Sequence, residues 1–155
     1  MTPNDEFLLK ALEAAKAAEH VFPAYAAAEA ALESGWGKSR LAVEANNLFG
    51  RKASRNQASE CACHNSTIVL NTKEYLHGEW VTVPAVWVKY PDWDSCFRDR
   101  MALLERLPSL YGEALAAPDG ESFIKLVSVH WSTDPNRAEK VLETFRAHQG
   151  VLNGN

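Results

Sequence analysis

Residues 23–39 read PAYAAAEAALESGWGKS, and this stretch decides the fold more than any other part of the chain. Proline suits the first position of a helix, and alanine has the highest helix propensity of all residues. Gly35 and Gly37 then end the pattern, because glycine readily adopts the left-handed backbone angles that close a helix. The stretch therefore predicts an alanine-lined helix that packs closely on its neighbours and ends at the carboxylate of Glu33.

Helical patterns lie on both sides of this segment. Before it, apolar residues recur at helical spacing between residues 7 and 18, which predicts an amphipathic helix ending near Val21. After it, residues 39–45 predict a short third helix that leads into Asn46-Asn47-Leu48-Phe49-Gly50. The polar residues 51–66 are predicted to form a loop.

A different pattern occupies the middle of the chain. Residues 67–75 and 80–90 are rich in Val, Thr, Tyr and Trp, with a turn at residues 77–79, and so predict a β-hairpin. Helical spacing returns after Pro91, and the final helix is predicted to have Asp134 as its cap and Pro135 as its first residue. We therefore predict an α+β, mainly helical fold with a small hairpin lobe at about residues 66–90.

Composition narrows the class of protein. The 155 residues, 46% of them hydrophobic, are enough to build one core, so we predict a single domain over residues 1–155. The net charge of -4 and the lack of a long basic run exclude the electrostatic footprint of a nucleic-acid binder. Charges interrupt the first twenty residues, so neither a signal peptide nor stable membrane insertion is predicted. We expect a monomer.

Glu33 has the setting of an acid catalyst. A carboxylate in the last turn of a buried helix faces the negative end of the helix dipole and loses solvent, and both effects favour its protonated form. Glycoside hydrolysis needs such an acid and usually a second carboxylate that activates water or stabilises the transition state. Glu74 on the hairpin could face Glu33 across a cleft between the helices and the hairpin. Glu79, Asp92 and Asp94 are the alternatives for this second role.

The segment 30–39, AALESGWGKS, followed by NNLFG at residues 46–50, resembles the glucosaminidase domains of glycoside hydrolase family 73. The resemblance extends over roughly residues 7–145. Its further matches are Thr72-Lys73-Glu74-Tyr75 with Gly78, Tyr90 with Ser95-Cys96-Phe97-Arg98-Asp99, and Ser132-Thr133-Asp134-Pro135 with Ala138 and Lys140.

This resemblance implies a lysozyme-like fold, in which a helical core and a β-hairpin lobe flank a saccharide-binding cleft. It implies that Glu33 is the general acid, that Glu74 assists the attacking water, and that no metal or organic cofactor is needed. The residues expected to contact substrate are Trp36, Asn46, Asn47, Phe49, Tyr75 and Trp131. Each kind of residue also has an alternative to substrate contact. The aromatic residues could belong to the core, as large aromatic residues more often do, and the two asparagines could bond to the backbone, as Asn pairs in loops more often do.

The chain departs from the family pattern at three positions. Trp131 stands where the family usually has Tyr, and it can stack on a sugar but cannot donate a phenolic hydrogen bond. Arg137 replaces a second Tyr. Glu29 stands where Gln is common, one helical turn before Glu33. If both are buried, Glu29 would raise the pKa of one of the two carboxyls by charge repulsion and help to hold Glu33 protonated; alternatively, Glu29 pairs with an arginine or caps a neighbouring segment.

Three cysteines form an odd set, which argues against a complete disulfide framework. The run Cys61-Ala62-Cys63-His64 contains zinc-binding residue types, but its spacing does not fit a structural zinc site. We predict free thiols, or an incidental link between Cys96 and one of the other two cysteines.

The predicted reaction is hydrolysis of the β-1,4 bond between N-acetylglucosamine and N-acetylmuramic acid in the glycan strands of peptidoglycan. An inverting, a retaining or a substrate-assisted mechanism is open. The alternatives are a muramidase or lytic transglycosylase acting on the same glycan, and an inactive glycan-binding module of a phage tail or flagellar assembly.

The predicted substrate lies outside the cytoplasm, whereas the chain shows no export signal. We therefore expect synthesis in the bacterial cytoplasm and action in the periplasm or cell wall. A holin, a phage particle or an export apparatus would deliver the protein, as for a bacteriophage endolysin or a flagellar wall hydrolase.

Overall fold

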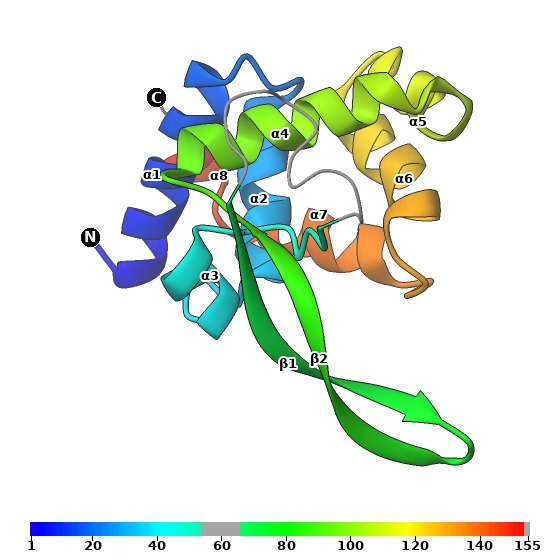
Figure 1. Cartoon of the computed structure of the whole chain (residues 1–155). Coiled ribbons are helices and arrows are strands. Elements are labelled where there is room, and N and C mark those ends of the chain that lie inside the picture. Colours follow the sequence, from blue (N-terminus) through cyan, green and yellow to red (C-terminus); the bar gives the residue numbers. More distant parts are fainter. Residues whose placement is uncertain (54–65, 154–155) are drawn as a thin grey trace.

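The computed structural model describes residues 1–53 and 66–153, and Figure 1 shows the chain as a helical body from which a hairpin projects. The elements in chain order are α1 (Pro3–Ala17), α2 (Pro23–Glu33), α3 (Arg40–Ala45), β1 (Ser66–Leu76), β2 (Glu79–Lys89), α4 (Trp93–Arg106), α5 (Pro108–Leu115), α6 (Gly120–Trp131), α7 (Arg137–Ala147) and α8 (Gln149–Leu152).

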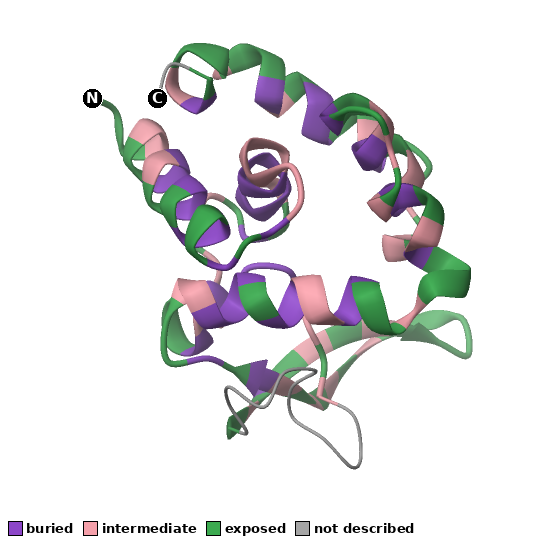
Figure 2. Cartoon of the chain, turned by 90° about the horizontal axis from the view of Figure 1, so that it is seen from above, coloured by how far each residue is buried: buried purple, intermediate pink, exposed green. Residues whose placement is uncertain are grey.

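Helix α2 is the centre of the body. It contacts α1, α6 and α7, and Figure 2, which looks along α2, shows the other helices around it. Five of its six alanines are fully buried: Ala26, Ala27, Ala28, Ala30 and Ala31. Side chains this small let the surrounding helices approach α2 closely, as the alanine-rich sequence predicts. The end of α2 is consequently held inside the body.

The hairpin predicted at residues 66–90 is confirmed. Strands β1 and β2 pair antiparallel from Ser66 with Lys89 to Leu76 with Glu79. His77 and Gly78 form the two-residue turn with φ angles of 53° and 85°, which is the pattern that suits the twist of a tight hairpin. The predicted α+β, mainly helical fold with a hairpin lobe is therefore observed, and Figure 1 shows the hairpin extending away from the body.

The two faces of the hairpin differ. On β1, the alternating positions 68, 70, 72 and 74 are less exposed than those between them, and on β2 the positions 81, 83, 85 and 87 behave alike. Glu74 therefore lies on the same face as the buried Leu70, not on the more exposed one. At the tip, Tyr75 and Trp80 are 60% and 70% exposed, and their rings lie 5.4 Å apart.

Two boundaries differ from the sequence-based expectation. Helix α7 begins at Arg137, and Asp134 closes a turn before it by accepting a hydrogen bond from the backbone of Asn136 at 2.9 Å. Asp134 is thus not the cap of α7. The predicted loop also begins with ordered pairing, since Lys52 forms a bridge with Trp87 and the backbone of Ala53 donates to Val86 at 3.0 Å.

Among residues 1–53 and 66–153, no helix is both long enough and apolar enough to cross a membrane.

Candidate active site

Glu33 is the last residue of α2, and a tight turn fixes its position. The Ser34 hydroxyl donates to the carbonyl of Ala30 at 2.6 Å and accepts from the backbone of Gly37 at 2.9 Å. Residues 35–37 all have positive φ angles, which accounts for the two glycines in the motif. The Glu33 side chain is 25% exposed and accepts a hydrogen bond at Oε1 from Nε of Arg137 at 2.8 Å.

A buried cluster of charged side chains lies directly behind Glu33. Glu29, one turn earlier on α2, has no exposed surface and forms ion pairs with Arg100 of α4 and Arg137 of α7. The Arg137 pair measures 3.4 Å between Nη1 and Oε1 of Glu29. Arg100 and Arg137 are each 2% exposed. The cluster therefore ties α2 to two helices that are distant in sequence.

The two arginines set the charge state of Glu29. Burial alone raises the pKa of the Glu29 carboxyl, but the guanidinium of Arg100, followed by that of Arg137, lowers it below its ordinary value. Glu29 is consequently held as a carboxylate with its charge neutralised. The pairing of Glu29 with arginine, one of the predicted alternatives, is therefore observed.

Arg100 is also enclosed by aromatic rings. Its guanidinium lies 4.6 Å from the ring centre of Phe49 and 4.4 Å from that of Trp131. A cation over an aromatic face is attracted by the ring, and more strongly when water is excluded. The cluster thus supports two of the aromatic residues that were predicted to contact substrate.

His20 completes the cluster and gives it a pH dependence. Its ring is buried, Nε2 lies 3.3 Å from Nη1 of Arg100, and Nδ1 lies 2.7 Å from the carbonyl of Val21. A neutral imidazole with its hydrogen on Nδ1 satisfies both contacts. Burial, followed by the charge of Arg100, lowers the pKa of His20 from 6.5 to about 4, against the opposing charge of Glu29.

This lowered pKa predicts acid sensitivity. Between pH 6.5 and pH 4 the unfolded chain binds a proton at His20 that the folded chain does not, so stability falls as the pH falls. The loss is about 3 kcal/mol when the pH reaches the folded pKa. Urea unfolding at a series of pH values measures it. We expect His20→Gln to flatten the profile in this window and the exposed control His130→Gln to leave it unchanged. Equal profiles for all three proteins would contradict the prediction.

Two hollows meet at Trp131. A cavity of about 310 Å³ is lined by Phe49, Gly50, Arg51, Lys52, Tyr111 and Trp131. A larger one of about 640 Å³ lies along the connection between α6 and α7, lined by residues that include Trp131, Thr133 and Asp134. The smaller cavity combines three aromatic side chains with two basic ones. The aromatic rings offer a stacking surface, whereas both basic groups already lie beside carboxylates, Arg51 beside Asp99 and Lys52 beside Glu74.

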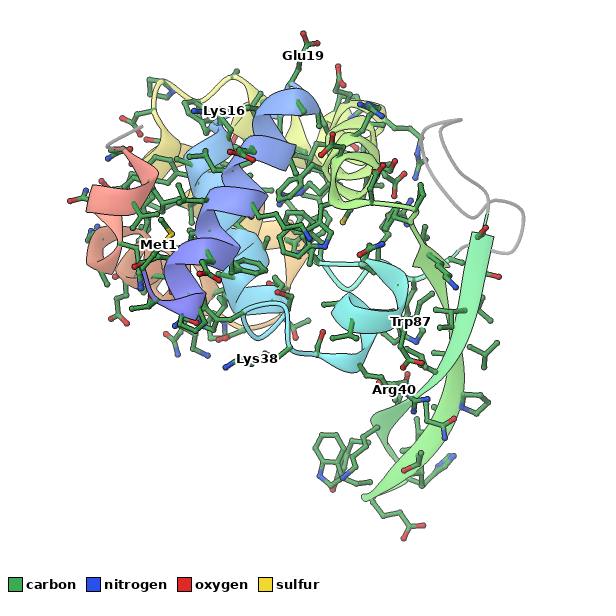
Figure 3. All side chains as sticks on the ribbon, turned by 90° about the vertical axis from the view of Figure 1, so that its left-hand side faces the viewer. Met1, Lys16, Glu19, Lys38, Arg40 and Trp87 are labelled. Atoms are coloured by element: carbon green, nitrogen blue, oxygen red, sulfur yellow. The ribbon has the colours of Figure 1, made fainter. Side chains whose placement is uncertain are left out.

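Glu74 is joined to the smaller cavity through Lys52. The Nζ atom of Lys52 lies 3.5 Å from Oε1 of Glu74 and 5.5 Å from the ring centre of Trp87. The Glu74 side chain is 41% exposed, which leaves it accessible to water. Figure 3 labels Trp87 on the hairpin where it lies close to the helical body. The predicted second carboxylate is thus on the hairpin beside a residue that lines the cavity.

The two asparagines serve the backbone. Asn47 is buried; its Nδ2 donates to the carbonyls of Val88 and Arg51 at 2.8 and 2.9 Å, and its Oδ1 accepts from the backbone of Arg51 at 3.0 Å. Asn46 donates to the carbonyl of Tyr90 at 3.0 Å. Both amides therefore fasten the hairpin to the helical body. The alternative of backbone bonding is the one observed, and direct substrate contact by the buried Asn47 is not supported.

The predicted aromatic residues lie in three different places. Phe49 and Trp131 line the smaller cavity and are 6.1 Å apart. Trp36 packs against Phe7 at 6.1 Å and His148 at 5.1 Å, which places its partly buried ring against the core, between helix α1 and the C-terminal part of the chain. Tyr75 is at the hairpin tip. The structure thus brings two of the four together.

Cys61, Cys63 and His64, which were considered as zinc ligands, lie outside the described residues. Cys96 is a buried free thiol, and burial raises the pKa of that thiol to about 12. Among residues 1–53 and 66–153, no group of three or more His, Cys, Asp or Glu side chains could hold a metal ion.

Sequence reasoning missed Arg100 and gave Arg137 no role. Arg100 follows Phe97 by three residues and precedes Leu104 by four, so it lies on the apolar stripe of α4, where a charge requires a buried partner. The position of Arg100 in this stripe could therefore have predicted a buried ion pair. Its partner could not have been predicted, because Glu29 lies 71 residues earlier in the chain.

Solved structures share this architecture over nearly the whole chain. The catalytic domain of the autolysin Auto from Listeria monocytogenes has a TM-score of 0.79 at 24% identity, covering 100% of this chain and 89% of that one. The glycoside hydrolase domain of FlgJ from Salmonella typhimurium has a TM-score of 0.73 at 26% identity, covering 95% and 98%. The fold is that of a lysozyme-like glycoside hydrolase domain.

Sequence comparison gives the family. Residues 9–150 match the glucosaminidase family, described as mannosyl-glycoprotein endo-beta-N-acetylglucosaminidase. The chain belongs to this family of glycoside hydrolases, as the resemblance to glycoside hydrolase family 73 predicts.

Two curated relatives agree with this assignment. Peptidoglycan hydrolase FlgJ of Pseudomonas aeruginosa is 32% identical over 153 residues, covering 94% of this chain and 37% of the relative. Exo-glucosaminidase LytG of Bacillus subtilis is 32% identical over 127 residues, covering 79% and 42%. The chain spans about two fifths of the length of these relatives.

Proposed function

We propose that this chain hydrolyses the β-1,4 bond between N-acetylglucosamine and N-acetylmuramic acid in peptidoglycan. The observation that carries the proposal is Glu33 itself, an accessible carboxylate at the end of an otherwise buried helix, within a glucosaminidase-family domain. The names of the relatives, a peptidoglycan hydrolase and an exo-glucosaminidase, support the choice of glycan.

In this proposal Glu33 protonates the oxygen that leaves when the glycosidic bond breaks. General acid catalysis of this kind contributes about 10²- to 10⁴-fold to a rate. Trp131 and Phe49 supply the stacking surface of the cavity, and the indole of Trp131 stacks on a sugar ring without the phenolic hydroxyl of a tyrosine. Tyr75 at the hairpin tip would contact a more distant part of the strand.

Glu74 is proposed to assist the attacking water. Its position on the less exposed face of β1 and its contact with Lys52 support this role over that of a solvated strand glutamate. With Glu74 in this role the reaction is a single displacement by water, whereas an attack by the substrate's own acetamido oxygen would need no second carboxylate.

Replacing Glu74 by Gln tests this role. We expect turnover to fall about 10²-fold with little change in KM, because a general base is lost while substrate contacts stay. Initial rates of reducing-end release on soluble glycan strands measure both constants, and Glu143→Gln at an exposed position of α7 is the control. Unchanged turnover in Glu74→Gln would exclude Glu74 and favour the acetamido route.

The proposal that the chain is an enzyme on peptidoglycan is tested by its products. Digesting purified peptidoglycan should release reducing sugar ends at a rate proportional to the protein concentration. Binding to the same material without any new reducing ends would instead identify an inactive glycan-binding module.

A second candidate is a muramidase, because a probable N-acetylmuramidase of Lactococcus lactis is 34% identical over 89 residues, covering 57% of this chain and 18% of the relative. A muramidase leaves N-acetylmuramic acid at the new reducing end, and a lytic transglycosylase leaves its anhydro form. Either enzyme would act in the cell wall, and delivery there by a holin, a phage particle or an export apparatus is part of the proposal.

A further inference from the structure

Arg137 links the proposed acid to the buried cluster. Its Nε donates to Oε1 of Glu33 at 2.8 Å, and its Nη1 lies 2.8 Å from the hydroxyl of Ser128 and 3.4 Å from Oε1 of Glu29. The guanidinium is planar and rigid, so fixing Nη1 also fixes the direction of Nε. Glu29 and Ser128 therefore determine where Arg137 holds Glu33.

These contacts engage only one oxygen of Glu33. In the described part of the chain, Oε1 accepts the bond from Arg137 and Oε2 has no hydrogen-bond partner. A guanidinium has five N–H donors and no acceptor, so a proton on Oε1 would point at another donor. When Glu33 is protonated, its hydrogen consequently belongs on Oε2, the oxygen that remains free for substrate.

Stability alone does not account for this arrangement. Arg137 is 2% exposed, and its Nη2 has no hydrogen-bond partner among the described residues. A buried donor without a partner costs free energy, and apolar residues of similar volume are often at least as stabilising as a buried ion pair. Costly buried charge beside a reactive group is the pattern expected of a functional constraint.

Two of the three departures from the family pattern, Glu29 and Arg137, also meet here. Glu29 and Arg137 belong to helices α2 and α7 and contact each other beside Glu33. The carboxylate of Glu29 compensates the charge of Arg137, so Arg137 can be buried next to Glu33. Each replacement is therefore explained by the other.

We propose that Arg137 is a positioning residue, fixed by Glu29 and Ser128, that orients the Glu33 carboxyl and directs its proton to Oε2. This inference rests on the proposed role of Glu33 as general acid. Arg137 does not touch the substrate, so its effect should appear in kcat and not in KM.

The test compares four variants on soluble glycan strands. We expect Arg137→Met to lower kcat about 10²-fold while KM changes less than about threefold, because a misplaced acid loses catalysis without losing binding. Arg137→Lys should recover part of the loss in kcat, since lysine keeps the positive charge but lacks the planar, forked N–H donors of the guanidinium. Arg146→Met, on the exposed side of α7, is the matched control and should behave as wild type.

The variant Ser128→Ala separates positioning from folding. It removes one of the two contacts that fix Arg137 and leaves the charges of Glu29, Arg100 and Arg137 in place, so the melting temperature should stay close to that of the wild type while kcat falls about three- to tenfold without a change in KM. A folded Arg137→Met or Ser128→Ala protein with wild-type kcat would overturn the proposal. A wild type without any turnover would overturn the proposed function as well, so the two failures are distinguishable.

Discussion

Replacing Glu33 by Gln is expected to lower the rate of reducing-end release from peptidoglycan by about 10³- to 10⁴-fold, at the upper end of what a general acid contributes. The amide keeps the shape of the side chain, and its oxygen can still accept the bond from Nε of Arg137. It has no acidic proton to give to the leaving oxygen. The melting temperature should therefore stay close to that of the wild type.

Glu44→Gln is the matched control for this experiment. Glu44 lies on the neighbouring helix α3, and its side chain is 39% exposed and paired with Arg40. We expect its activity to stay within about twofold of the wild type, as is usual for surface substitutions. A folded Glu33→Gln protein with more than about a tenth of wild-type activity would contradict the assignment of Glu33.

The second large effect is expected on stability. Arg100→Met should lower the free energy of unfolding by about 3–5 kcal/mol, because it removes the nearest cation from the fully buried Glu29. It also removes the cation between the rings of Phe49 and Trp131. Urea unfolding measures the loss, and Arg98→Met, at an exposed position of the same helix, is the control.

The double variant Glu29→Gln/Arg100→Met identifies the cause of that loss. If the uncompensated charge of Glu29 is responsible, the double variant should be more stable than Arg100→Met alone. A loss in Arg100→Met no larger than that in Arg98→Met would show that the buried ion pair contributes nothing.

Local chemistry explains why much of the fold could be predicted from the sequence. Pro23, the alanines and the glycines at 35 and 37 set the start, the packing and the end of α2 within one short segment. The hairpin is likewise read from its β-forming residues and from His77-Gly78 at the turn. In each case neighbouring residues decide the structure, without help from distant parts of the chain.

The features that could not be predicted depend on distant partners. Asn47 carries no sign that its amide bonds to Val88, 41 residues later. Asp134 has the sequence of a helix cap, but it instead accepts from the backbone of Asn136 and pairs with Lys140. Both residues satisfy ordinary hydrogen-bonding rules, and only the fold determines which partner they use.

The candidate site likewise contains residues that local motifs identify and residues that depend on distant partners. Glu33 and Glu74 were selected through the resemblance of their surrounding motifs, because an isolated glutamate is usually a solvated surface residue. The buried charges behind Glu33 join α2, α4 and α7, whose contacts no local pattern gives. The arginine partners of Glu29 therefore emerged only from the structure.

The identity of the new sugar end tests the central claim most directly. Purified peptidoglycan is digested with the wild-type protein, the products are reduced with borohydride, and the reduced ends are identified by mass spectrometry. The proposed glucosaminidase predicts reduced N-acetylglucosamine at the new ends. Reduced N-acetylmuramic acid, or anhydro-muramic ends that borohydride leaves unchanged, would contradict it and assign the chain to the other bond.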